Sequence, residues 1–71
     1  WQDHMPPHFH ALYGDDEVLV DIGRAAVLRG RLPPSRLKLA LAWAEIHRDE
    51  LLANWERARR GEPLVPIEPL R

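Results

Sequence analysis

The stretch HFHALYGDDEVLVDI, residues 8–22, decides the fold of this chain. Its first part, HFHALY at 8–13, has the composition of a β-strand, and the GDD that follows is typical of a tight turn. In EVLVDI at 17–22, apolar side chains recur at every second position and share one strand face: Val18, Val20 and Ile22. We therefore predict a β-hairpin that buries the face carrying the two valines.

The chain on either side of the turn at Gly23 extends this hairpin into a larger unit. AAVLRG at 25–30 reads as a third strand, and a small antiparallel meander needs a helix packed on it to be stable. Ser35 is a natural N-cap, so we predict one long helix from Arg36 to Arg60 that ends at Gly61. At about 1.5 Å per residue this helix would extend past so small a sheet. Its core stripe is predicted to be Leu37, Leu41, Ala44, Leu51, Trp55 and Ala58.

The tail EPLVPIEPL, residues 62–70, has a proline at every third position. That spacing suits a polyproline II conformation. We interpret the tail as a strap across the domain rather than as a ligand for a partner, with four apolar residues available to dock: Leu64, Val65, Ile67 and Leu70. The predicted fold class is α+β: a small antiparallel meander packed against one long helix and closed by an extended strap.

Length and composition limit the classes of protein to which the chain can belong. Its 71 residues make one small domain, residues 1–71, with a marginal core of its own. The absence of cysteine suits a reducing cytoplasm and excludes a thiolate metal site. No apolar run approaches the roughly 18 residues of a membrane span. Because the first residue is Trp1, we expect that the sequence lacks its start, and that some of the core is absent or is supplied by a partner.

The charges are unevenly distributed although the net charge is only −1. Residues 1–23 hold five acids and no Lys or Arg, whereas residues 24–38 hold five bases and no acid: Arg24, Arg29, Arg31, Arg36 and Lys38. With so small a net charge, no global field steers the domain to nucleic acid. A second basic cluster, Arg57, Arg59 and Arg60, either complements the dipole at a helix C-terminus or binds phosphate.

Three of the four histidines lie close together around a Pro-Pro pair. In an extended HFH, His8 and His10 point to the same face, which is a sound geometry for two metal ligands. His4 would complete the three protein ligands of a catalytic zinc or other divalent metal site. The alternative is that these are surface histidines that form hydrogen bonds within the meander.

A second group lies on the predicted helix, within a sector of about 60° at the border of the core stripe: Trp43, His47, Glu50 and Asn54. Such a stripe is either a hydrogen-bond network that anchors helix to sheet or part of a functional site. If the first strand turns its histidine face to this stripe, His8, His10, His47 and Glu50 form a cluster suited to acid–base chemistry or RNA cleavage. Substrate contacts would then come from Trp43 and Asn54, and from Arg29, Arg31 and Arg36 as phosphate ligands.

The motifs DHMPPHFHALYG at 3–14, GRLPP at 30–34, WAEIHRDEL at 43–51 and IEPL at 67–70 closely resemble a bacterial family, the domain of unknown function numbered 4160. The resemblance spans essentially the whole chain, and members usually begin with a further strand or two. The resemblance therefore implies that N-terminal strands are missing from this sequence, which fits its start at Trp1. Motif positions of that family match His4, Pro6, Pro7, His8, His10, His47, Glu50 and Trp55.

The resemblance implies a partner but no chemistry. Genes of that family often lie beside those of another small family, numbered 2442, which has prompted a toxin–antitoxin assignment. The leading hypothesis is accordingly a toxin with a cognate antitoxin-like partner, acting on RNA through the His/Glu cluster. One alternative is a non-catalytic interaction module, whose His/Glu cluster is structural and whose partner is another protein or a second copy of the chain. Another alternative is a metal-dependent hydrolase.

Overall fold

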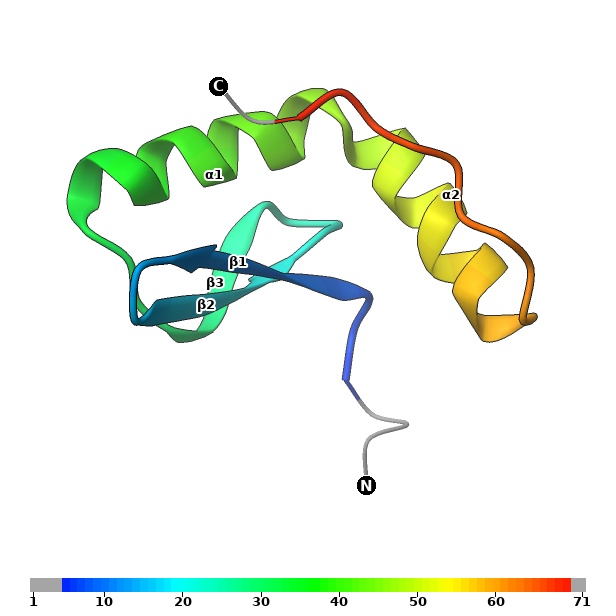
Figure 1. Cartoon of the computed structure of the whole chain (residues 1–71), viewed down its shortest axis with the longest axis horizontal. Helices are drawn as coiled ribbons and strands as arrows, with labels where there is room; N and C mark the ends of the chain where they lie inside the picture. Colours follow the sequence, from blue (N-terminus) through cyan, green and yellow to red (C-terminus); the bar gives the residue numbers. More distant parts are fainter. Residues whose placement is uncertain (1–4, 70–71) are drawn as a thin grey trace.

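The computed structural model describes residues 5–69 and shows three strands followed by two helices (Figure 1). Neighbouring strands are antiparallel and lie in the order β1-β2-β3, so the predicted meander and the α+β class are confirmed. The sheet is open, with β1 and β3 at its two edges. The elements are β1 (His8–Tyr13), β2 (Asp16–Asp21), β3 (Ala26–Gly30), α1 (Pro34–Ile46) and α2 (Arg48–Arg59).

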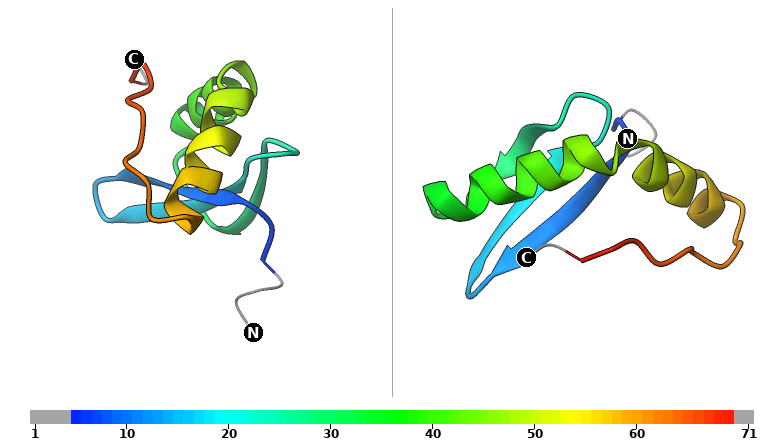
Figure 2. Two further views of the ribbon diagram at one scale, coloured as in Figure 1. Left: turned by 90° about the vertical axis from the view of Figure 1, so that its right-hand side faces the viewer. Right: turned by 90° about the horizontal axis from the view of Figure 1, so that it is seen from above.

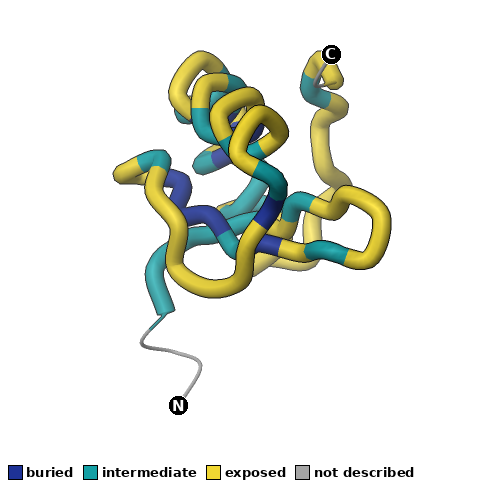
Figure 3. Tube along the Cα trace, turned by 90° about the vertical axis from the view of Figure 1, so that its left-hand side faces the viewer, coloured by how far each residue is buried: buried dark blue, intermediate teal, exposed yellow. Residues whose placement is uncertain are grey.

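The core lies between one face of the sheet and the two helices. Val18 and Val20 are fully buried, and Ile22 is 2% exposed, as their alternation predicts. The register pairs Phe9 with Val20 and Ala11 with Val18, which places all four side chains on the helix-covered face. Figure 2 shows α1 lying over the sheet and α2 descending beyond one end of it, and Figure 3 shows the buried positions where sheet and helices face one another.

The prediction of one long helix was wrong, because the helix is interrupted at His47. An unbroken helix of the predicted length would measure nearly 40 Å by its rise of about 1.5 Å per residue, and the longest extent of the molecule is 34 Å. The break lets α2 turn down past the end of the sheet (Figure 1), where Trp55 packs against the His8 ring at 5.0 Å. Ala44 before the break and Leu51 after it are both buried.

The start of α1 differs from the prediction, whereas the end of α2 agrees with it. The N-cap of α1 is Pro33, and Pro34 is the first helical residue, where its missing N–H costs no hydrogen bond; the prediction of Ser35 as N-cap was therefore wrong. Gly61 takes a left-handed φ of 72°, as predicted for the residue after the helix. Its N–H donates to Ala58 O, while Glu62 N–H donates to Arg57 O at 2.8 Å, which is a Schellman motif.

The burial of two alanines on the helices differs from the predicted core stripe. Ala58, predicted in the core stripe, is exposed because α2 overhangs the sheet at its C-terminal end. Ala40 is buried instead, one turn before Ala44, because these small side chains let α1 lie close to the sheet. Neither helix in the described part of the chain is long and apolar enough to cross a membrane.

Candidate functional site

The C-terminal strap lies along the helix stripe that the sequence singled out. Residues 62–69 run back from the end of α2 toward α1 (Figure 1). The Asn54 side-chain amide donates to Val65 O at 2.7 Å and accepts from Val65 N–H at 2.9 Å. The indole N–H of Trp43 donates to Glu68 O at 2.8 Å. Both predicted substrate-binding residues of the stripe therefore hold the backbone of the strap.

The other two stripe residues form a pair at the helix junction. His47 Nδ1 donates to Glu50 Oε1 at 2.5 Å, and the His47 ring packs on Trp43 with centroids 5.2 Å apart. His47 precedes α2, so Glu50 lies in the first turn of that helix, where a carboxylate complements the helix dipole. The pair lies at the junction of α1 and α2, and its hydrogen bond does not anchor helix to sheet as the predicted network would.

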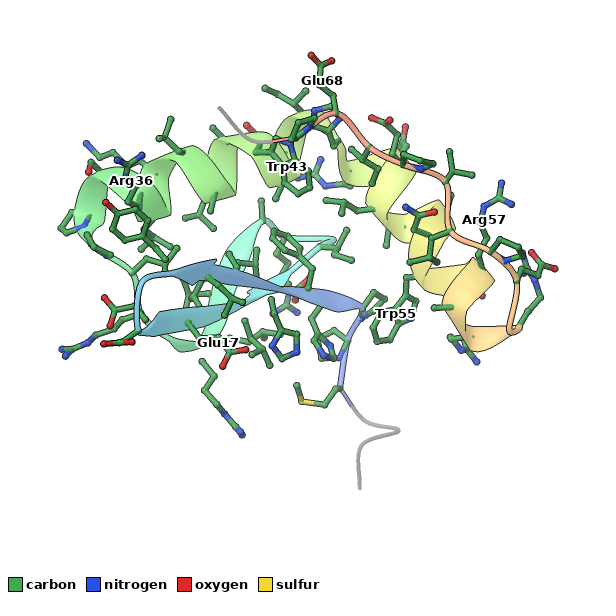
Figure 4. The ribbon with its side chains drawn as sticks, in the orientation of Figure 1. Glu17, Arg36, Trp43, Trp55, Arg57 and Glu68 are labelled. Atoms are coloured by element: carbon green, nitrogen blue, oxygen red, sulfur yellow. The ribbon has the colours of Figure 1, made fainter. Side chains whose placement is uncertain are left out.

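Phe9 separates the two halves of the predicted cluster. Its ring meets Trp43 edge-on at 5.6 Å, on the face covered by the helices. Because side chains alternate along β1, His8 and His10 point to the opposite face. Figure 4 shows Trp43 above the sheet and Glu17 below it, and Glu17 Oε2 accepts from His10 Nδ1 at 2.5 Å. The structure thus places the four candidate catalytic residues in two regions instead of one cluster.

Glu17 belongs to the candidate site but was not predicted from the sequence. The two-residue turn Gly14-Asp15 pairs Tyr13 with Asp16, and this register places Glu17 diagonally from His10 on the uncovered face. The signal was present in the sequence, because the turn type sets the register of a hairpin and thereby all its cross-strand neighbours.

His8 has its own environment at the start of β1. Its Nδ1 donates to Pro6 O at 2.9 Å, and its ring lies 5.8 Å from the His10 ring. Within residues 5–69, no group of three His, Cys, Asp or Glu side chains is placed to hold a metal ion. The third predicted ligand, His4, lies outside the described residues, so the zinc or other divalent metal site stays a prediction.

The three arginines expected to hold phosphate lie in different surroundings. The Arg36 guanidinium lies 4.7 Å above the Tyr13 ring. Arg29 pairs with Leu19 across the sheet, and Leu19 pairs with His10, so the three form one row on the uncovered face. Arg31 lines a shallow surface hollow of about 320 Å³ beside Asp16.

The second basic cluster is occupied by local ion pairs. Arg59 pairs with Glu56 at 3.4 Å, and Arg60 pairs with Glu62 at 3.1 Å. Arg57 and Arg59 lie in the last turn of α2, where positive charge complements the helix dipole. The observed contacts therefore favour the interpretation that this cluster complements the helix dipole over the interpretation that it binds phosphate.

Comparison with known proteins returns one family. The model of that family, described as a domain of unknown function (DUF4160), matches residues 1–56. Neither the curated proteins nor the solved structures include a match. The matched segment contains the DHMPPHFHA stretch, the sheet, all of α1, and α2 as far as residue 56, whereas the strap lies beyond it. With most of its length matched, the chain belongs to the family described as domain of unknown function DUF4160.

Proposed function

We propose that the protein is a non-catalytic interaction module, one component of a cytoplasmic two-protein pair, which binds an extended segment of its partner along the free edge of β3. The observation that carries this proposal is the exposure of β3. All five of its residues are exposed, and among residues 5–69 the only strand paired with it is β2. An edge strand presents a row of backbone donors and acceptors that another chain can pair with.

The composition of this edge fits strand addition. Val27 and Leu28 keep 41% and 38% of their surface exposed, so a docked segment would cover apolar area. In strand addition the main-chain hydrogen bonds supply affinity, and alternate side chains supply specificity. The contacts of Trp43, His47 and Asn54 support a non-catalytic role, because these side chains bond to the strap or to the neighbouring Glu50.

The charge along this edge indicates which partner segment fits. Arg29 and Arg31 flank Gly30, and no carboxylate of residues 5–69 lies within ion-pair distance of either guanidinium. Complementary charge gives such an interface its specificity and association rate. The expected partner segment is therefore an extended, acidic stretch with β-branched residues.

Selection from a displayed library of random peptides about ten residues long, enough for one strand, tests the proposal on the full chain. We expect selected peptides to be rich in Asp and Glu, and to shift the amide resonances of residues 26–30. The double substitution Arg29→Glu, Arg31→Glu should reverse the charge preference, whereas Arg59→Glu, Arg60→Glu should leave it unchanged. Peptides that shift other residues, or a preference insensitive to the first substitution, would contradict the proposal.

A second candidate function rests on the His10–Glu17 pair. Both side chains are about half exposed, at 54% and 50%, on the sheet face that no helix covers. A carboxylate that orients an imidazole is a common arrangement for general acid–base catalysis. With Arg29 in the same row, this pair would serve RNA cleavage, the activity that the sequence analysis assigned to a toxin.

Cleavage of a fluorescent RNA by the purified chain, together with growth arrest on expression, tests this second candidate. General acid–base groups typically contribute about 10²–10⁴-fold, so His10→Ala should lower cleavage by at least about a hundredfold. Glu17→Gln should lower it less, and the exposed Glu45→Gln should have no effect. Absence of cleavage by the unaltered chain, or full activity in His10→Ala, would rule this candidate out.

A further inference from the structure

The strap occupies a defined seat on the helices, which we call the strap seat: Trp43, Ala53, Asn54 and Arg57. Three hydrogen bonds join seat side chains to the strap, and each of them ends on a backbone atom of Val65 or Glu68. Because these bonds are made to the main chain, the strap seat recognises an extended backbone, whether this backbone belongs to the same molecule or to another.

The strap is well suited to be bound as a separate segment. Prolines at 63, 66 and 69 restrict it to extended conformations, so little conformational entropy is lost when it docks. The bonded N–H at Val65 lies between two of these prolines, where the donor is still available. Sequence and contacts therefore resemble those of a short proline-containing peptide in a receptor groove.

The strap is only lightly held in its own molecule. Ile67 is its one half-buried residue among those described, while Leu64 and Val65 are 59% and 50% exposed. A space of about 130 Å³ remains between the strap and α2, beside Val65 and Ile67. The strap joins α2 through Gly61, a single pivot with a left-handed φ of 72°. Rotation at this glycine would break the Glu62 N–H bond to Arg57 O and free the strap, while leaving the sheet and both helices in place.

We propose that two copies of this chain exchange straps, so that the strap of each molecule lies in the strap seat of the other. Each exchanged strap makes the same contacts that the structure shows within one molecule, which is why such an exchange is a low-cost route to a symmetric dimer. The strap lies beyond the matched residues 1–56, and the exchange does not depend on the proposed partner at β3.

Two complementary full-length variants test the exchange. Asn54→Ala weakens the seat and keeps the strap, whereas Val65→Pro with Ile67→Asp weakens the strap and keeps the seat. Neither variant alone can form an intact exchanged contact, but a mixed dimer restores one. By analytical ultracentrifugation we expect the unaltered chain to dimerise with rising concentration. Each substitution weakens strap docking equally in the closed monomer and in the exchanged dimer, so the mixture is the diagnostic sample. Only the mixed dimer has an intact strap contact that neither variant can make within one molecule, and it should form at least about tenfold more readily than either variant's own dimer, the effect of about 1.4 kcal/mol. The equimolar mixture should regain a mixed dimer.

The controls separate strap exchange from other modes of association. Trp43→Phe removes the indole N–H and part of the ring system but keeps an aromatic ring against Phe9, so it can serve as the seat variant in the mixture if Asn54→Ala folds poorly. Glu56→Gln, outside the seat, should dimerise like the unaltered chain. An unaltered chain that stays monomeric, or a mixture in which the mixed dimer forms no more readily than either variant's own dimer, would overturn the proposal.

Discussion

Gly30 is the residue with the strictest steric requirement in this domain. Its φ is +84°, and a Cβ built there would lie 2.2 Å from the backbone oxygen of Glu17. The close approach occurs where β3 leaves β2, and Arg31 N–H donates to that same oxygen at 3.0 Å. Gly30 therefore lets the chain leave the sheet toward α1 without losing this hydrogen bond.

Gly30→Ala should destabilise the fold through both backbone strain and steric overlap. We expect a loss of roughly 3 kcal/mol or more in the free energy of unfolding, because strain at a special φ belongs to the most costly class of substitutions. The measurement is urea denaturation followed by tryptophan fluorescence.

Gly14→Ala is the matched control for this substitution. Gly14 also has a left-handed φ, of +60°, but a Cβ added there would have no atom within 4 Å. It should lose only the conformational term of about 1–2 kcal/mol. Equal losses for the two variants would show that the contact with Glu17 is unimportant.

At the scale of the elements, the break between α1 and α2 shapes the molecule. The sequence carries a signal for it in Asp49 and Glu50, which lie in the first turn of α2, where acidic residues favour a helix start. The apolar spacing continues across the break, so periodicity alone predicted one helix. Arg48 interrupts the predicted core stripe. Its side chain reaches the end of the sheet, where its Nε donates to Ile22 O at 3.4 Å.

Packing of α1 on the sheet depends on small side chains, which gives a second prediction. Ala44 is completely buried, whereas Ala42 on the same helix is exposed. Ala44→Leu should lower the free energy of unfolding by about 1–3 kcal/mol through overpacking. Ala42→Leu, with the same change in helix propensity, should alter it by no more than about 0.5 kcal/mol. Comparable thermal melts for the two variants would argue against close contact at Ala44.

At the scale of the whole molecule, the two proposed interactions differ in physical character. Binding at β3 relies on Arg29 and Arg31, whereas the strap is held by backbone hydrogen bonds and by Ile67. Salt screens the first kind of interaction much more than the second. The two surfaces can therefore be distinguished in solution without any substitution.

The third prediction concerns ionic strength. Raising it from about 0.1 M to about 1 M shortens the Debye length from about 10 Å to about 3 Å. Acidic peptides at β3 should bind at least several-fold more weakly at high salt, as titrations of peptide fluorescence anisotropy would measure. The dimerisation constant for strap exchange should stay within about twofold, since the contacts that hold the described strap in its seat are backbone hydrogen bonds and apolar packing. Parallel salt dependences would contradict this separation.

The sequence by itself determined the strands, the hairpin turn, the valine face of the core and the left-handed Gly61, because each depends on chemistry within a few residues. It also determined that His8 and His10 share a face. Only the tertiary structure decided that the helices cover the opposite face, that of Phe9, and that His10 meets Glu17 rather than Glu50. The helix break and the strap seat were likewise decided by packing: they depend on the size of the sheet and on contacts between segments distant in the sequence, which local periodicity does not contain.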